Sequence, residues 1–217
     1  MPRIIDILLS TLALLILLPF FVPIVVILLL TGEHKVFYSQ TRVGYKNQNF
    51  KILKFATMLS NSANMGSGSL TLKNDPRVLP FGSFLRKTKI NELPQILNII
   101  IGDLSIVGPR PQMQVDFEKY SDEVQKKIYD VRPGLTGIGS IIFRDEESII
   151  SAVKDEDPHE FYKRIIAPYK GELEMWYQSN NSFFLDLQLI FMTAWAIIFP
   201  ETRLYEKWFK DLPKRSF

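Results

Sequence analysis

The chain has 217 residues, of which 47% are hydrophobic and 23% are charged, and its net charge is +3. This balance excludes wholesale disorder and suits one globular domain with an accessory segment. The absence of cysteine excludes disulfides, thiolate metal sites and cysteine nucleophiles. The small basic excess suits anionic partners such as lipid headgroups, nucleotides or lipid phosphates, without selecting among them.

An uncharged apolar run from Ile7 to Leu30 lies near the start of the chain. A run of this length is enough to cross a bilayer as a helix. Pro19 and Pro23 each remove a backbone hydrogen bond, so we expect a kink. Two forms stay open: a tilted helix that spans the bilayer, and a re-entrant helix-break-helix that enters and leaves on one face. A cleaved signal peptide is the competing interpretation, but a small-residue cleavage site is missing before Thr31.

The distribution of basic residues around this run predicts its orientation. Arg3 is the only basic residue before it, whereas several follow it closely, namely Lys35, Arg42, Lys46, Lys51 and Lys54. The positive-inside rule then puts the main body in the cytoplasm. We expect residues 1–33 to be embedded in the membrane and residues 34–217 to form a domain on its cytoplasmic face.

The segments that follow predict an α/β body that is mainly helical. Val36–Tyr38 and Phe50–Phe55 have the composition of short strands, and Ser60–Ser69 is a loop rich in serine, asparagine and glycine. A helix is expected over Ser83–Lys89. A second is expected from Asn91 to Gly102, with asparagine as N-cap, proline in the first turn and glycine after the last turn.

Two stiff turns flank a polar segment in the second half of the chain. Gly108–Pro111 would hold Arg110 at a fixed angle, and Arg132–Gly137 is a second rigid basic loop. Between them, Asp116–Val131 predicts a polar amphipathic helix. Farther on, Ser182–Phe199 is apolar but too short and too polar for a second span. We expect an interfacial amphipathic helix over about residues 182–199.

The candidate chemistry lies in basic and acidic residues on rigid turns. A P-loop, a dinucleotide glycine motif, a zincin pair and a Ser-His-Asp order are all missing from the sequence. Arginine forks on such turns suit phosphate oxygens; they occur at Arg77, Arg86, Arg110, Arg132 and Arg144, and Lys87 lies beside one of them. Glu92, at the start of the expected helix, suits metal binding or attack at phosphorus. The alternative is that Glu92 only complements the helix dipole.

Ordered sequence blocks resemble the bacterial sugar transferases, and more narrowly the monotopic polyprenyl-phosphate phosphoglycosyl transferases. They cover nearly the whole chain, together with its proline-broken apolar start. The blocks are Arg42-Val43-Gly44, Lys54-Phe55-Ala56-Thr57-Met58, Asn74-Asp75-Pro76-Arg77, Leu85-Arg86-Lys87-Thr88, Glu92-Leu93-Pro94-Gln95, Gly102-Asp103-Leu104-Ser105, Val107-Gly108-Pro109-Arg110-Pro111 and Val131-Arg132-Pro133-Gly134.

The resemblance implies a re-entrant helix broken at Pro19 and Pro23 and a Mg²⁺-dependent site at the cytoplasmic face of the bacterial inner membrane. A carboxylate would attack the β-phosphorus of a UDP-sugar and release UMP, and polyprenyl phosphate would then take the phosphosugar, opening the assembly of a surface glycan. The implied partners are the UDP-sugar, polyprenyl phosphate and membrane lipids, without nucleic acid; a homodimer stays open. The implied site residues are Asn91 and Glu92 for catalysis, Glu92 with Asp145 as a second candidate for the metal, and Lys54, Arg77, Arg86, Lys87, Arg110, Arg132 and Arg144 for phosphate.

The sequence departs from the family pattern at its most important position. Asn91 stands where the family has the nucleophilic aspartate, and an amide cannot form an acyl phosphate. Leu18 replaces a serine before the membrane proline, Ala56 replaces a usual basic residue, and Ile138–Arg144 replaces a Trp-Ala-Gln-Val-Asn-Gly-Arg segment.

Three alternatives follow from Asn91. Another carboxylate serves as the nucleophile, with Glu92 first and Asp145 or Glu146 next. Alternatively, the lipid phosphate attacks the donor directly. In the third, the chain is a non-catalytic, membrane-anchored partner that binds nucleotide sugars.

Overall fold

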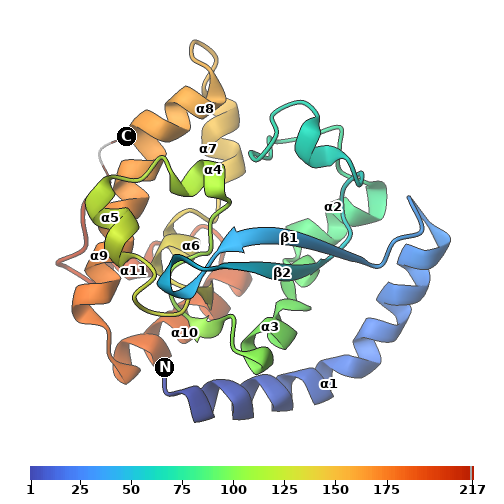
Figure 1. The fold of residues 1–217 in the computed structure, drawn as a ribbon, viewed down its shortest axis with the longest axis horizontal. Helices are drawn as coiled ribbons and strands as arrows, with labels where there is room; N and C mark the ends of the chain where they lie inside the picture. The colour runs from blue at the N-terminus through green and yellow to red at the C-terminus, as the bar shows by residue number, and fades with distance from the viewer. Residues whose placement is uncertain (216) are drawn as a thin grey trace.

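A long apolar helix, α1 (Arg3–Leu30), lies along one side of a mixed α/β body (Figure 1). The computed structural model describes residues 1–215 and 217. α1 is one helix that continues through Pro19 and Pro23, so the expected division into two helices is not seen. Figure 1 shows instead that α1 bends along its length. Within the described residues it is the one helix long and apolar enough to cross a membrane.

The first turns of α1 are attached to the body by polar contacts. The Arg3 guanidinium donates to the carbonyl of Ile100 at 3.0 Å. The buried Asp6 carboxylate accepts hydrogen bonds from Ser105 Oγ at 2.9 Å and from the backbone N–H of Ile106 at 3.0 Å. Both charged side chains of this apolar helix, Arg3 and Asp6, are therefore bonded to the body rather than to solvent.

The last turns of α1 are attached to the same body by apolar contacts. Leu28 packs in a small core with Phe55 and Leu85. The rings of Phe21 and Phe55 meet edge to face with their centroids 5.3 Å apart. Between its two attached ends the helix presents an exposed apolar face, which includes Leu8, Leu12, Leu15, Ile16, Leu18, Phe20, Val22, Leu29 and Leu30.

The two strands expected after the membrane segment are confirmed as a hairpin. β1 (Phe37–Val43) pairs antiparallel with β2 (Asn49–Phe55), and Phe37 lies opposite Phe55. β1 is longer than expected, because its polar residues alternate with half-buried positions that the sequence pattern did not reveal. The turn between the strands contains Lys46 and Asn47 in the left-handed region, with φ of 55° and 58°.

A second, parallel pair of strands was not expected. β3 (Ser105–Val107) pairs with β4 (Gly134–Thr136). Three-residue strands carry too little alternation to be predicted, yet this pair joins the two proline turns. The contact requires glycine, because a Cβ added to Gly134 would lie 2.1 Å from the backbone nitrogen of Gly108. The two rigid basic loops of the sequence are thus neighbours in space.

The expected helix from Asn91 to Gly102 is partly wrong. Asn91 lies inside a 3₁₀ turn, Ile90–Glu92, and its side chain caps nothing. The α-helix, α3, runs only from Gln95 to Ile101, after Pro94, which cannot donate a backbone hydrogen bond. The C-terminal glycine is confirmed, since Gly102 has a φ of 117°. Because of this turn, Asn91 is not at the start of a helix; it lies in the wall of the large cavity described below.

The expected helix Asp116–Val131 is wrong. The chain forms α4 (Gln114–Phe117) and then α5 (Asp122–Lys127), with Ser121 as the N-cap of the second. A serine followed by two acidic residues is a strong helix start, so the chain begins a new helix there. The helix expected over Ser83–Lys89 exists as α2 (Pro80–Lys87), which begins earlier because proline suits the first helical position.

The remaining helices form the main core. They are α6 (Ile138–Ile142), α7 (Glu146–Ala152), α8 (Pro158–Phe161) with a π-turn over Tyr162–Ile166, α9 (Ala167–Asn180), α10 (Phe183–Ile198) and α11 (Leu204–Trp208). α10 corresponds to the expected helix near residues 182–199. Its inner face is buried, but its outer face is apolar rather than polar and includes Phe183, Phe184, Leu187, Phe191, Trp195, Ile197 and Ile198.

Candidate active site

A large open cavity of about 840 Å³ gathers most of the predicted site residues. Its walls come from both strands of the hairpin, the segment 57–79, α2, the turn before α3, residues 110–116 and 144–150, the π-turn and the start of α9. The predicted residues that line it are Lys54, Arg77, Arg86, Lys87, Asn91, Glu92, Arg110, Arg144 and Asp145. Predicted residues as far apart in the chain as Lys54 and Asp145 therefore share one site.

Glu92 lines this cavity and is held by two cations. Arg110 Nη2 lies 2.7 Å from Glu92 Oε1, and Arg110 Nη1 lies 3.5 Å from Oε2. Lys54 Nζ, from β2, lies 3.3 Å from the same Oε1 atom. Burial alone would raise the pKa of Glu92, but the charges of Arg110 and Lys54 outweigh it and hold that pKa well below its usual range. Glu92 is therefore an anion at neutral pH.

The two cations respond differently to the same carboxylate. Glu92 raises the pKa of Arg110 above its usual value, in opposition to burial. For Lys54, burial is the largest effect and lowers the pKa to about 7, although Glu92 acts in the other direction. Arg110 is thus a permanent cation, whereas Lys54 titrates near neutral pH.

The segment that carries Arg110 is fixed from behind. The hydroxyl of the buried Tyr129 donates to the carbonyl of Arg110 at 2.9 Å and accepts from the backbone N–H of Gln112 at 3.0 Å. The proline turn, its pairing with the second turn and this hydrogen bond together fix the backbone around Arg110. The turn at Gly108–Pro111, which was predicted to be stiff, is thus bonded to the body from two sides.

Asn91 lines the cavity beside Glu92 and is only 5% exposed. Its Oδ1 atom has no hydrogen-bond partner among the described residues. A buried polar atom without a partner is unfavourable by about 1–3 kcal/mol. A bound ligand or ion that contacts Oδ1 would remove this penalty, at the position where the resemblance implies a nucleophilic aspartate.

Further charged groups line the cavity that sequence analysis did not assign to the site. Arg42, from β1, donates to Gln40 Oε1 at 2.6 Å and to the carbonyl of Pro111 at 3.3 Å. Lys170, from α9, lies 2.7 Å from Glu146. Arg42 belongs to one of the blocks that resemble the family, and this block could have indicated a role in the site. The sequence offers no such indication for Lys170, because α9 was not expected and this lysine is buried in the fold.

Arg77 lines the same cavity but is fully engaged within the protein. Its guanidinium bonds both oxygens of Asp75 and also accepting groups in the preceding loop, namely the carbonyls of Ser62, Met65, Gly68 and Leu70 and the hydroxyl of Ser67. Arginine has only five N–H donors. In this arrangement Arg77 holds the loop around Ser60–Ser69 in place, and each of its nitrogens is already bonded.

The other predicted phosphate ligands differ in how they are engaged. Arg86 forms an ion pair with Glu147. Lys87 and Arg144 line the cavity and have no ion-pair partner among the described residues. Arg132 does not line the cavity; its Nε donates to the carbonyl of Gly102 at 3.0 Å, and its guanidinium lies 5.1 Å from the ring centre of Tyr45.

The acidic residues present fit a magnesium ion that takes most of its ligands from substrate and water. The described part of the chain contains no group of three or more His, Asp or Glu side chains gathered for a metal. Mg²⁺, however, is commonly held by one or two carboxylates together with substrate phosphates. Glu92 and the unpaired Oδ1 of Asn91 supply hard oxygen donors in one cavity, and Asp145 lines it as well.

Comparison with known proteins identifies the family of the chain. The sequence model of the family described as bacterial sugar transferase matches residues 1–200. The chain is 33% identical over 206 residues to the exopolysaccharide production protein ExoY of Rhizobium meliloti (strain 1021), covering 88% of this chain and 83% of that protein.

Two longer relatives carry more specific names. The chain is 31% identical over 196 residues to the UDP-N-acetylgalactosamine-undecaprenyl-phosphate N-acetylgalactosaminephosphotransferase of Aeromonas hydrophila, covering 89% of this chain and 42% of that protein. It is 30% identical over 175 residues to the undecaprenyl-phosphate galactose phosphotransferase of Salmonella typhimurium, covering 74% of this chain and 33% of that protein. With a family match over nearly its whole length, the chain belongs to the bacterial sugar transferase family.

Proposed function

We propose that this enzyme transfers a sugar 1-phosphate from a UDP-sugar to polyprenyl phosphate, giving a polyprenyl-diphosphate sugar and UMP. The observation that carries the proposal is the open cavity in which Arg110, Lys54 and Arg42 surround the anionic Glu92. Such a cluster suits the diphosphate of a nucleotide sugar. The Aeromonas and Salmonella relatives, whose names specify UDP-N-acetylgalactosamine or galactose and undecaprenyl phosphate, support the same reaction here.

The cations would act mainly by electrostatic stabilisation. In the overall reaction an oxygen of the lipid phosphate ends bonded to the β-phosphorus, while the bond from that phosphorus to the bridging oxygen breaks and UMP leaves with the electron pair. Negative charge develops on the transferring group and on the leaving oxygen. Arg110 and Arg42 would bind that charge as preorganised guanidinium groups, and Lys54 would add a third cation below pH 7.

Mg²⁺ would join this site with the substrate. Glu92 would be its first protein ligand, with Asn91 Oδ1 and Asp145 as further candidates. When bound, the ion neutralises part of the charge on the phosphates. Asn91 would then contribute as a neutral oxygen donor at a position that cannot form an acyl phosphate.

The body would lie on the cytoplasmic face of the inner membrane, with α1 entering and leaving from that face. α1 has 28 residues, which corresponds to a length of roughly 42 Å at about 1.5 Å per residue. A spanning helix of this length would have its ends on opposite sides of a hydrocarbon core about 30 Å thick. Here Arg3 and Leu28, near the two ends, both contact the same body, which supports re-entry.

The reaction is tested with purified protein, a panel of UDP-sugars and Mg²⁺. UMP release that depends on polyprenyl phosphate, together with a lipid-linked phosphosugar, is the expected result. Intact mass measured without acceptor then separates the routes, since an adduct indicates an enzyme carboxylate as nucleophile and its absence indicates direct attack by the lipid phosphate. Failure of every donor to turn over would overturn the proposal and favour a nucleotide-sugar-binding partner.

Asn91→Asp is the matched variant for this measurement. If the amide is what prevents a covalent intermediate, the variant gains a phosphosugar adduct that the parent lacks. An adduct of equal yield in both proteins would show that another residue, Glu92 first, is the nucleophile.

The topology is tested by cysteine labelling, because the natural chain has no cysteine. Pro2→Cys and Lys35→Cys report on positions beside the two ends of α1. A membrane-impermeant maleimide should label both in inside-out vesicles and neither in intact spheroplasts. Labelling of the two positions from opposite faces would show a spanning helix.

A further inference from the structure

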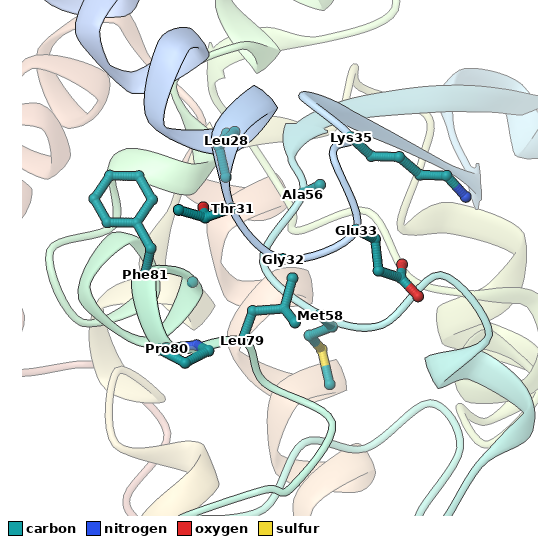
Figure 2. A pocket seen from close by; sticks show the side chains of 11 residues that line it. Leu28, Thr31, Gly32, Glu33, Lys35, Ala56, Met58, Leu79, Pro80 and Phe81 are labelled. Carbon is teal, nitrogen blue, oxygen red and sulfur yellow. The ribbon is translucent and has the colours of Figure 1, made fainter.

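A second, smaller cavity lies where α1 ends and α2 begins. It has a volume of about 240 Å³ and is lined by Leu28, Ala56, Leu79 and Phe81 among others. Figure 2 shows the side chains of Leu28, Phe81 and Leu79 around it, with Ala56 and Met58 completing the wall. Leu28 lies in the last turn of α1, the apolar helix that we propose to enter the bilayer, so this cavity lies at the point where the helix returns to the body.

This apolar cavity adjoins the polar one. Met58, Leu79 and Pro80 line both. A molecule with an anionic head and an apolar tail could therefore lie across the shared wall, with its head among the cations and its tail against Leu28 and Phe81. Polyprenyl phosphate has this chemistry, whereas a nucleotide sugar does not.

The charged residues beside the apolar cavity are engaged with each other through Ser60. The Glu33 carboxylate accepts from the backbone N–H of Ser60 at 2.7 Å and also from its hydroxyl. Lys35 Nζ donates to the same Ser60 Oγ at 2.7 Å. With its charges paired in this way, the cavity offers an apolar ligand a surface of aliphatic and aromatic carbon.

The size of the cavity depends on a residue that is unusual for the family. Ala56 lines the cavity at a position where the resemblance places a basic residue. A longer side chain from this position would enter the space. A dry cavity of about 150 Å³ accommodates a benzene molecule. The 240 Å³ available here therefore suits one or two five-carbon isoprene units rather than a long chain.

We propose that this apolar cavity binds the isoprene units nearest the phosphate of the lipid acceptor and so positions that phosphate in the cationic cavity. The inference rests on the proposed function and specifies where its acceptor lies. The remainder of the lipid chain would continue into the bilayer beside α1. Since the bilayer is itself apolar, the cavity contributes position more than affinity.

Ala56→Phe tests this by filling the cavity. The ratio kcat/KM for polyprenyl phosphate should fall by about tenfold or more, because the phosphate can no longer align. The Kd for the UDP-sugar, measured without acceptor, should stay within about twofold of the parent value. Ala152→Phe, on the exposed end of α7 and outside both cavities, is the matched control and should change neither quantity.

A photoreactive acceptor tests the same inference in the unaltered protein. Polyprenyl phosphate with a diazirine on its first isoprene unit should label the peptide that contains residues 79–82 in nanodiscs, and unlabelled polyprenyl phosphate should compete. Labelling confined to the outer faces of α1 or α10 would refute the site, as would unchanged acceptor kinetics in Ala56→Phe. If the parent makes no lipid product but the peptide is labelled, the proposed reaction fails while the lipid site stands.

Discussion

Arg77 and Arg110 both lie beside prolines and both line the large cavity, but their guanidinium groups are in opposite situations. Arg77 is 3% exposed and bonds Asp75 and the preceding loop with every nitrogen it has. Arg110 is paired with Glu92 alone and faces open space. A position on the cavity wall therefore does not identify a phosphate ligand. A phosphate ligand is identified by N–H donors that the protein itself leaves without a partner.

The largest effect should come from Arg110→Gln. Removing a preorganised donor from a charged transition state lowers turnover by about 10²–10³-fold. Because Arg110→Gln also removes a positive charge, we expect a loss near the upper limit of this range. Thermal stability should fall less than in Arg77→Met, because Glu92 keeps Lys54 as a partner and lines an open cavity, and Tyr129 still holds the backbone of residue 110. The measurement is kcat/KM with each substrate varied, and Arg110→Lys is the control that keeps the charge without the fork. Near-normal turnover in Arg110→Gln would remove this residue from the mechanism.

Arg77→Met should act mainly on stability. Removing one partner of a buried ion pair destabilises a protein by about 3–5 kcal/mol, because Asp75 would stay charged and buried. The interaction with Arg77 keeps the pKa of Asp75 at about 2. Thermal unfolding in detergent should show a lower Tm than for Arg110→Gln. If Arg77→Met lowered turnover without lowering Tm, the contrast between the two arginines would be lost.

Lys54, unlike the two arginines, should make substrate binding depend on pH. Its pKa of about 7 means that the side chain is charged below pH 7 and neutral above it. The affinity for UDP should therefore fall severalfold as pH rises from 6 to 8, since a cation near the diphosphate is lost. Calorimetric titration of the Lys54→Arg variant should show a flatter profile, because arginine stays protonated. If the affinity of the parent for UDP changed as little with pH as that of the variant, Lys54 would not be the titrating group.

The smallest effect should come from Arg132→Gln. This arginine lies outside the cavity, donates to the Gly102 carbonyl and lies over Tyr45. We expect a loss of about 1 kcal/mol of stability and turnover within about twofold of the parent. A loss of turnover comparable to that of Arg110→Gln would show that Arg132 reaches the substrate during the reaction.

Sequence reasoning identified the residues of the site better than their tasks. The blocks around Lys54, Glu92 and Arg110 correspond to one cavity, because rigid turns and short strands bring them together. The sequence could not show that the donors of Arg77 are all bonded to Asp75 and the preceding loop. Those bonds depend on the direction of backbone carbonyls, which no side-chain pattern encodes. Nor could it show Lys170, which reaches the cavity from an unforeseen helix.

The fold was predictable where local signals were strong and not where tertiary contacts decided. The hairpin and the apolar helix carry clear patterns of alternation and hydropathy. The parallel pair β3–β4 depends instead on the close approach of Gly108 and Gly134, which lie far apart in sequence. The N-cap signal at Ser121 lies inside a longer polar segment, and this continuity hides the break between α4 and α5.

The attachment of α1 has a consequence for how the protein is made. α1 leaves the ribosome before the body does, and the groups that bond Arg3 and Asp6 belong to residues about a hundred positions later. At a synthesis rate of about 5–20 residues per second, they arrive roughly 5–20 s afterwards. During this interval the nascent helix must be held by lipid or by a chaperone. Its entry into the bilayer must also stay shallow enough for the charged side chains of Arg3 and Asp6 to bind to the body once it is made.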